Sequence, residues 1–143
     1  MNLSIALAKV ELSDLTQIEE LFAVCGWDWF GLQQDAQKAF DGSFFNVTAM
    51  IDRRLVGFGR VISDGAVYGL IVDLMTHPDF RRQGVGHKLT EFILQKCTDR
   101  SLKVIQLLAS TLGRSVYLQS GFTQCPDHSP GMIKFLSATA VAR

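Results

Sequence analysis

The order of hydrophobic and polar residues along this 143-residue chain predicts strands that alternate with helices. A first strand is expected over residues 3–10, and apolar side chains then recur at helical intervals from Leu15 to Cys25. A weaker helical pattern covers residues 32–40 and ends at an Asp-Gly pair. The N-terminal part of the chain is therefore expected to form one strand followed by two helices.

Three strands are expected next, over residues 44–51, 55–63 and 66–76. Asp64 and Gly65 lie between the second and the third strand. An Asp-Gly pair suits a two-residue hairpin turn, because both residues of that turn need a positive φ. The third strand is apolar almost throughout, which is typical of a central strand that is covered on both faces.

The second half of the chain shows a change to helical periodicity and then shorter patterns. A long helix, a strand, a short helix and two closing strands are expected over residues 84–98, 103–109, 113–120, 122–125 and 132–136. If the long helix is a crossover, the strand after it runs parallel to the strand before it. Residues 1–143 are therefore expected to form one α/β domain, with helices packed on a mixed sheet.

Composition and charge narrow the choice of partners. The 14 Lys and Arg residues balance the 14 Asp and Glu residues, which gives little support to a basic face for nucleic acid or a polybasic membrane patch. No apolar run approaches the roughly 18 residues of a membrane span. We therefore expect a small molecule or a peptide as partner, with no nucleic acid and no membrane.

Cysteine and histidine give no sign of a disulfide framework or a metal site. The cysteines are far apart and form no C-x-x-C, and the histidines lack ligand spacing; these residues are Cys25, Cys97, Cys125, His77, His87 and His128. Small buried cysteines in a reducing compartment are the simpler interpretation. The N-terminal stretch shows neither the basic region nor the cleavage site of a signal peptide. We therefore expect no metal and a cytoplasmic location.

A glycine-rich segment, RRQGVGHKL at residues 81–89, stands between the apolar strand and the long helix. This arrangement presents free backbone N–H groups at the positive end of a helix, and glycine lets an anion approach them. The dinucleotide fingerprint G-x-G-x-x-G would need a glycine where Leu89 stands, and the sequence G-x-x-x-x-G-K-[ST] is absent. The loop therefore suits a phosphate group but matches neither nucleotide-binding motif.

Two motifs of the chain resemble those of the GNAT superfamily of acyl-CoA-dependent N-acetyltransferases. Arg81, Gly84 and Gly86 fill the family pattern [QR]-x-x-G-x-[GA] after the central strand. A second family pattern, Y-x-x-x-G-F, begins at Tyr117, about 30 residues further along. The expected element order also resembles that of the family over residues 3–136, so the resemblance covers nearly the whole chain.

The resemblance implies a mostly antiparallel mixed sheet with one splayed parallel strand pair, about four flanking helices, and acetyl-CoA as co-substrate. The CoA diphosphate would lie on loop amides and the pantetheine arm along the end of the central strand. The loop positions are Arg81, Arg82, Gln83, Gly84, Val85, Gly86 and His87, and the strand positions are Leu74, Met75 and Thr76. A bulge near Asp73 would part the two strands. Ser110 stands where the family commonly has an Asn that contacts CoA.

The resemblance further implies direct acyl transfer from the thioester to a neutral amine. Tyr117 would protonate the leaving sulfur, because a phenol remains protonated at pH 7. A backbone N–H near Met75 would hold the oxyanion. Asp73 is the best-placed carboxylate to take the proton of the amine, with Tyr68 and ordered water as other options. Alternatively, Asp73 only hydrogen-bonds a bulged backbone.

The acceptor side is expected after the first helix. Trp27, Asp28, Trp29 and Phe30 form either an aromatic wall with one charge, suited to a cationic amine, or a simple cover for the sheet. We expect acetyl transfer to a primary amine of a small metabolite. The alternatives are acetylation of proteins or peptides, and a non-catalytic module that binds acyl-CoA, although an intact Tyr117 argues against the latter. The resemblance also raises the expectation of a homodimer.

Overall fold

The computed structural model of the protein describes residues 2–27 and 35–136. The strands are β1 (Leu3–Ala8), β2 (Phe45–Ile51), β3 (Arg54–Ser63), β4 (Tyr68–Thr76) and β5 (Val104–Gln106). The α-helices are α1 (Leu15–Val24), α2 (Ala36–Asp41), α3 (Val85–Asp99) and α4 (Arg114–Gln119). Two short 3-10 turns precede α1 and α3, namely η1 (Leu12–Asp14) and η2 (Pro78–Phe80).

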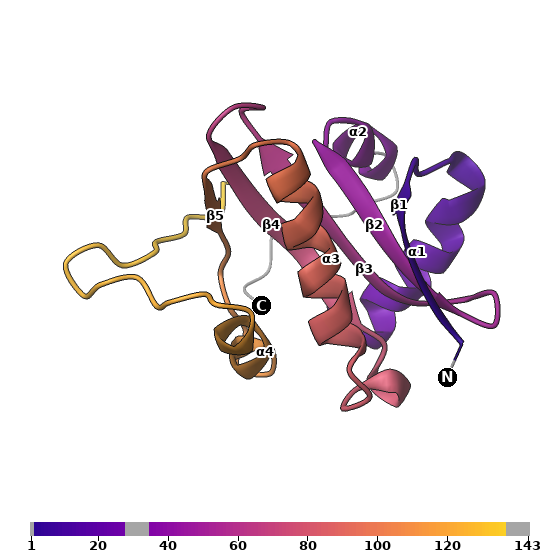
Figure 1. Cartoon of the computed structure of the whole chain (residues 1–143). Coiled ribbons are helices and arrows are strands. Elements are labelled where there is room, and N and C mark those ends of the chain that lie inside the picture. Colours follow the sequence, from indigo (N-terminus) through magenta and orange to yellow (C-terminus); the bar gives the residue numbers. More distant parts are fainter. Residues whose placement is uncertain (1, 28–34, 137–143) are drawn as a thin grey trace.

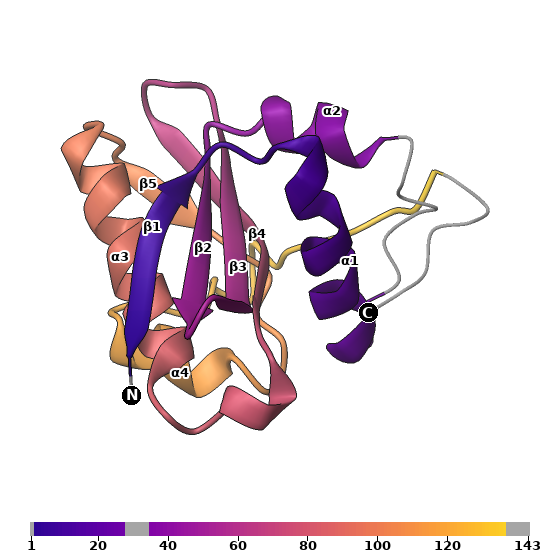
Figure 2. The same cartoon turned by 90° about the vertical axis from the view of Figure 1, so that its right-hand side faces the viewer.

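The strands form one sheet in the order β1-β2-β3-β4-β5. The first four pair antiparallel, whereas β4 and β5 run parallel because α3 crosses over between them. α3 covers one face of the sheet, and α1 and α2 cover the other (Figure 1, Figure 2). The mixed, mostly antiparallel sheet with flanking helices is therefore confirmed.

Apolar side chains fill the space on each side of the sheet. On the face under α3, Leu89 of the helix packs with Val47 of β2, and neither has measurable exposure. On the other face, the ring centroids of Phe22 in α1 and Phe40 in α2 lie 6.3 and 5.4 Å from that of Phe58 in β3. These contacts fix α1 and α2 over β3.

The C-terminal part of the chain differs from the expectation. The strand expected over residues 103–109 is limited to β5, and the described chain has no strand over residues 122–125 or 132–136. Met132 and Leu136 are each 91% exposed, so this segment does not pack against the sheet as a closing strand would. It runs out beyond β5 and returns (Figure 1). The expectation was wrong because a short apolar run does not distinguish a strand from an extended loop.

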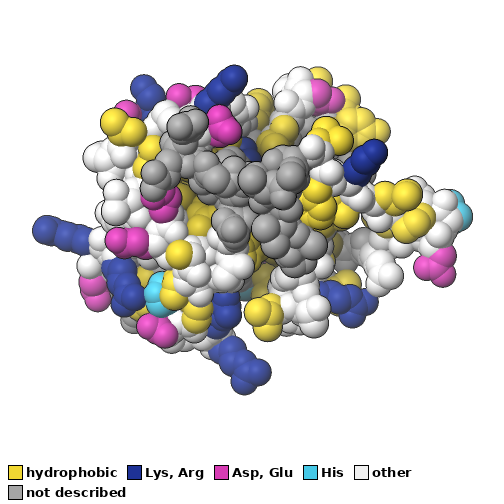
Figure 3. All heavy atoms as spheres, turned by 180° about the vertical axis from the view of Figure 1, so that it is seen from behind, with side chains coloured by type: hydrophobic (Ala, Val, Ile, Leu, Met, Phe, Trp, Pro, Cys, Tyr) yellow, Lys and Arg dark blue, Asp and Glu magenta, His cyan; other side chains and the backbone are white. Residues whose placement is uncertain are grey.

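Charges of both signs are mixed on the face that carries α1 and α2. In Figure 3, Lys and Arg side chains stand among Asp and Glu side chains around the visible part of this face, without a field of a single sign. Within residues 2–27 and 35–136, no helix is both long enough and apolar enough to cross a bilayer.

β3 carries two glycines, Gly57 and Gly59, at positions where side chains of α3 and atoms of β4 lie close to its backbone. A Cβ at Gly59 would lie 2.9 Å from the Cδ1 atoms of both Ile93 in α3 and Leu74 in β4. A Cβ at Gly57 would lie 3.3 Å from the carbonyl oxygen of Met75. The missing side chains therefore allow α3 and the end of β4 to pack close to β3.

We expect Gly59→Ala to lower the free energy of unfolding by about 1–3 kcal/mol, because the added methyl overpacks a buried site. Urea denaturation followed by circular dichroism measures this change. Gly86→Ala in α3 is the matched control, because its Cβ would make only an ordinary contact of 3.5 Å with Oγ1 of Thr76 and alanine favours a helix. An equal loss of stability in the two variants would contradict the packing argument.

Candidate functional site

Strand β4 has partners on both edges for only part of its length. β5 pairs with Tyr68, Gly69 and Leu70 alone, whereas β3 remains paired with β4 as far as Thr76. Among the described residues, the outer edge of β4 therefore has no strand partner from Ile71 to Thr76. This divergence is the splayed parallel pair that the resemblance implies.

A bulge in β4 lies within this unpaired stretch. Between the paired residues Val72 and Met75, both Asp73 and Leu74 face only Gly59 of β3. Asp73 has a φ of 55°, which is in the left-handed region that aspartate tolerates better than most residues. The bulge predicted near Asp73 is confirmed, and it turns the end of β4 away from regular pairing.

The side chain of Asp73 is buried in an ion pair. Its Oδ2 accepts a hydrogen bond from Nε of Arg60 at 2.7 Å, and the two side chains are 1% and 9% exposed. A general base must reach the proton that it removes, directly or through one water. This burial does not support direct contact of Asp73 with an amine. Arg60 was not among the site residues expected from the sequence, although a lone cation within the apolar stretch LVGFGRVIS was a signal.

Thr76 directs its backbone polar groups toward the unpaired edge. The N–H of the next residue, His77, donates to the carbonyl of Val56 in β3 at 2.7 Å, and successive residues of a strand face opposite edges. The carbonyl of Thr76 accepts from Sγ of Cys25 at 3.4 Å and from Nε of Arg81 at 3.3 Å. Burial raises the pKa of the Cys25 thiol, which keeps its proton available for this bond.

The glycine-rich loop forms the start of α3. Gly84 is the N-cap with a φ of 82°, and within the described chain no side chain caps the helix. The N–H groups of a first helical turn have no partner inside the helix and form its positive end. Because a Cβ at Gly86 would lie 3.5 Å from Oγ1 of Thr76, these groups lie beside the end of β4. The loop thus offers anion-binding geometry next to the unpaired edge.

Side chains around this loop are engaged in local contacts. Arg81 bonds to the end of β4 as described, and Nε2 of Gln83 donates to the carbonyl of Asp79 at 3.3 Å. His87 has a buried Nδ1 for which the described structure offers no hydrogen-bond partner. The arginines of the loop, Arg81 and Arg82, are exposed. Backbone amides are therefore the main groups that the loop can present to an anion.

Tyr117 lies on α4, which both views place at the end of the molecule where β4 ends and α3 begins (Figure 1, Figure 2). Its ring packs edge-on against Phe122, with centroids 6.0 Å apart. It also covers Gly113, where a Cβ would lie 2.9 Å from Cε2 of the tyrosine and 3.0 Å from its hydroxyl oxygen. Burial raises the pKa of Tyr117, so its hydroxyl is protonated at neutral pH. The glycine thus makes room for the tyrosine.

Ser110 forms the turn that leads into α4. Its Oγ accepts from the N–H of Gly113 at 3.1 Å, and its carbonyl accepts from the N–H of Arg114 at 3.0 Å. The residue is exposed, and these bonds place it at the start of α4, the helix that carries Tyr117. Its hydroxyl hydrogen remains able to donate, because the bond from Gly113 uses only a lone pair.

Of the two tryptophans proposed for the acceptor side, only Trp27 lies within the described residues. Trp27 packs against the core under α1, and its ring lies edge-on to that of Phe22 with centroids 6.2 Å apart. Trp27 is partly buried, so it covers apolar residues while part of its ring faces solvent. Trp29, with its neighbours Asp28 and Phe30, lies outside the described residues.

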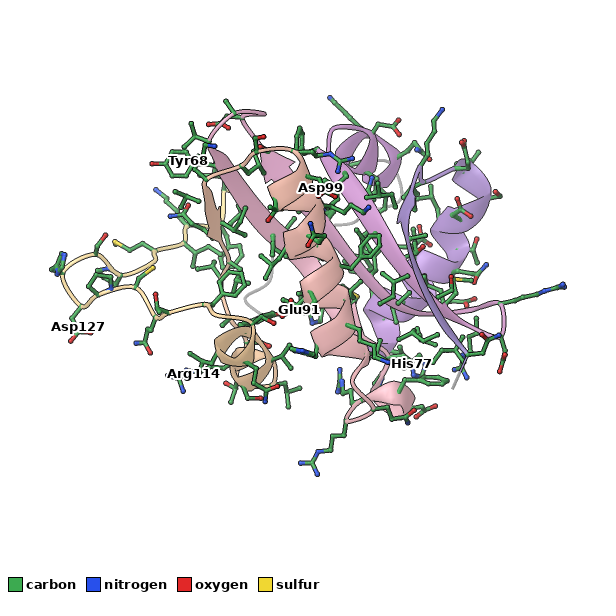
Figure 4. The ribbon with its side chains drawn as sticks, in the orientation of Figure 1. Tyr68, His77, Glu91, Asp99, Arg114 and Asp127 are labelled. Atoms are coloured by element: carbon green, nitrogen blue, oxygen red, sulfur yellow. The ribbon has the colours of Figure 1, made fainter. Side chains whose placement is uncertain are left out.

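Tyr68 lies far from the other candidates. It is 52% exposed at the beginning of β4, whereas the loop and Tyr117 are near the end of that strand. At about 3.3 Å per residue, the length of β4 separates the two ends by roughly 25 Å. Figure 4 shows Tyr68 and His77 at opposite ends of the strand. This distance argues against Tyr68 as the residue that takes the proton of the amine.

His77 has a structural environment in the turn after β4. Its Nδ1 accepts from the N–H of Asp79 at 3.1 Å, and its Nε2 lies 3.1 Å from Nη2 of Arg54. Within residues 2–27 and 35–136, no group of three His, Cys, Asp or Glu side chains is arranged to hold a metal ion.

Comparisons with known proteins agree with this geometry. Residues 24–132 match the family model described as an acetyltransferase (GNAT) domain. The chain is 30% identical over 123 residues to the uncharacterized N-acetyltransferase ycf52 of Gracilaria tenuistipitata var. liui, a match that covers 83% of this chain and 67% of that protein.

Solved structures share the fold over almost the whole chain. A probable acetyltransferase of unknown function from meticillin-resistant Staphylococcus aureus is 26% identical with a TM-score of 0.78, over 93% of this chain and 99% of that one. A predicted acetyltransferase from Clostridium acetobutylicum, crystallised with acetyl-CoA, is 17% identical with a TM-score of 0.68, over 91% of this chain and 96% of that one. Because its sequence identity is only 17%, the second structure supports the fold of this chain and nothing about its activity.

Tyr117 should make folding stability fall in strongly alkaline solution. Its pKa is raised in the folded state, so above the unfolded value near 10 the unfolded chain releases this proton first. The contribution of Tyr117 to the free energy of unfolding is fully present below about pH 10. It is lost as the pH rises toward the pKa of Tyr117 in the folded state. Tyr117→Phe should therefore lose less stability than the wild type between about pH 9 and 11.

Urea unfolding at several pH values in this range measures the difference between the two proteins. Tyr68→Phe is the matched control, because it removes the same hydroxyl group from a tyrosine that is 52% exposed. Identical slopes for the wild type and Tyr117→Phe would contradict the placement of Tyr117 in a desolvated environment.

Proposed function

The chain belongs to the acetyltransferase (GNAT) domain family and is an N-acetyltransferase, and on this basis we propose that it transfers the acetyl group of acetyl-CoA directly to a primary amine of a small metabolite. The supporting observation is the unpaired edge of β4 beside the uncapped start of α3. An extended molecule with a diphosphate fits both features at once, since such a molecule can pair with a strand edge while its phosphates meet helix amides.

Acetyl-CoA, the acetyl donor of this family, is the proposed co-substrate. We assign its diphosphate to the loop and its pantetheine arm to the end of β4, through Arg81, Arg82, Gln83, Gly84, Val85, Gly86 and His87 and through Leu74, Met75 and Thr76. Ser110 is the proposed contact from the turn before α4, because its hydroxyl can still donate. The geometry around the loop favours backbone contacts over the arginine side chains.

The proposed reaction is attack of the amine nitrogen on the thioester carbon. The N–H of Thr76 is the proposed oxyanion donor instead of that of Met75, because the backbone of Thr76 faces the unpaired edge. As the carbon–sulfur bond breaks, Tyr117 gives its proton to the sulfur, and the phenolate then recovers, through water, the excess proton on the attacking nitrogen, which leaves a neutral amide. The raised pKa of Tyr117 supports this role, since the hydroxyl carries its proton at neutral pH.

The amine must reach its neutral form before it attacks. For an alkylamine with a pKa near 10.4, this costs roughly 4–5 kcal/mol at pH 7. Asp73 was the best-placed carboxylate in the sequence, with Tyr68 and water as the other options, but its 1% exposed side chain is bonded to Arg60, which does not favour a direct base. We therefore propose that water takes the proton and that Asp73 acts on the shape of β4.

A small amine is the favoured acceptor for two reasons. The described side chains on the face that carries α1 and α2 have mixed charges and form no acidic field for a basic peptide (Figure 3). Trp27 gives this side an aromatic surface that is partly open to solvent, and aromatic faces attract cationic amines. Trp29 is the second aromatic residue that we assign to the acceptor side, on the sequence alone.

The test begins with binding and continues with turnover. Acetyl-CoA at about 100 times its dissociation constant should stabilise the protein by about 2.7 kcal/mol, which a thermal shift records. Release of CoA thiol is then measured against a panel of small amines and, separately, of peptides. Turnover with small amines supports the proposal. Turnover with peptides only would replace the acceptor class, and binding without any turnover would favour an acyl-CoA-binding module.

We expect Tyr117→Phe to lower kcat by about 10²–10⁴-fold, because the leaving sulfur loses its proton donor. The dissociation constant for acetyl-CoA should change little, since the hydroxyl acts on the transition state more than on the bound substrate. Steady-state kinetics and calorimetric titration measure the two quantities. Tyr68→Phe is the matched control, and an unchanged kcat in Tyr117→Phe would remove Tyr117 from the mechanism.

A further inference from the structure

A buried ion pair joins the two central strands at the bulge. Arg60 of β3 and Asp73 of β4 bond through Nε and Oδ2 at 2.7 Å, and both residues are buried within otherwise apolar stretches. Burying two charges carries a desolvation cost that their attraction often fails to repay, so well-packed apolar residues could be equally stable here. Stability alone therefore does not explain this pair.

Arg60 also reaches the end of α2. Its Nη1 donates to the carbonyl of Ala39 at 3.3 Å and to Oγ of Ser43 at 3.2 Å. The guanidinium lies 5.7 Å from the ring centroid of Phe40 in the same helix. One side chain thus connects α2 and β3 with the bulge of β4, and a planar guanidinium can make these bonds in several directions at once.

The bulge needs such a support because of its backbone conformation. Asp73 has a φ of 55°, which costs energy for a residue with a side chain. A carboxylate that is bonded in place holds this conformation. β4 pairs with β5 only as far as Leu70, so the bulge lies inside the unpaired stretch, and its conformation determines how the edge from Leu74 to Thr76 is directed.

We propose that Arg60 is a positioning residue for acetyl transfer, which holds Asp73 and the β4 bulge so that the pantetheine arm and thioester meet the edge of β4. The inference rests on the proposed function. It assigns Asp73 to the same positioning pair and not to proton removal. Removal of the pair should weaken contacts with the pantetheine arm, while the phosphate contacts at the start of α3 remain.

The test compares CoA with 3′-phospho-ADP, the part of CoA that lacks the pantetheine arm. The main variant is Arg60→Met combined with Asp73→Asn, which removes both charges of the pair together and keeps a residue that tolerates a positive φ at position 73. Calorimetric titration should show CoA binding weakened by about tenfold or more and 3′-phospho-ADP binding within about twofold of the wild type. The value of kcat/KM for acetyl-CoA should fall together with the affinity for CoA. Circular dichroism checks that the double variant is folded.

Two further single variants test the role of Arg60 independently of the double variant. Arg60→Lys retains the charge but lacks the branched guanidinium, so it should lie between the wild type and the double variant in CoA binding. Arg100→Met is the matched control, because Arg100 also lies over an aromatic ring, 4.9 Å from the centroid of Phe45, but stands at the far end of α3. If the double variant does not fold, the Arg60→Lys comparison decides the question.

Several results would overturn the inference. CoA and 3′-phospho-ADP weakened equally, or neither weakened, would show that the pair does not position the pantetheine arm. Loss of the acidic limb of the pH profile of kcat/KM in the double variant would assign Asp73 to proton removal. If the wild type itself fails to bind CoA, the proposed function fails, whereas unchanged variants of an active wild type would disprove only the role of Arg60.

Discussion

Loss of pairing along one edge of β4 is the constraint around which this molecule is arranged. Backbone N–H and carbonyl groups that leave a sheet need other partners, and the carbonyl of Thr76 finds them in Arg81 and Cys25. These two bonds fix the end of the strand from the loop and from α1 at once. Because strand residues alternate, the N–H of Thr76 itself is directed at the edge that β5 has left, where an extended substrate can complete the sheet.

Missing side chains are as important to this arrangement as those that are present. Gly59 stands opposite the two residues of the bulge, and a methyl there would meet Leu74 and Ile93. Gly113 has the corresponding place under Tyr117. In both cases a glycine allows a neighbouring residue of the site to adopt its position, so that packing in the interior determines the geometry at the surface.

The sequence predicts correctly those parts of the fold that depend on residues close together along the chain. The glycine-rich loop, the long helix and the bulge near Asp73 all depend on residues close together in the sequence. The partner of Asp73 depends on strand register and on the bulge itself, so Arg60 could not be assigned from spacing. The closing strands failed for a related reason, because residues 132–136 have a strand-like composition but no neighbouring strand in the structure.

The buried carboxylate of Asp73 bears on how an amine can be activated without a dedicated base. Transfer of the proton to Asp73 would break its bond to Arg60, and an arginine side chain that is only 9% exposed would lose a charged partner at 2.7 Å. That cost would be added to the cost of deprotonating the amine. A site that selects the neutral fraction of the amine and releases the proton to water avoids the first cost altogether. The same ion pair that shapes β4 therefore favours a mechanism in which orientation and oxyanion binding carry the catalysis.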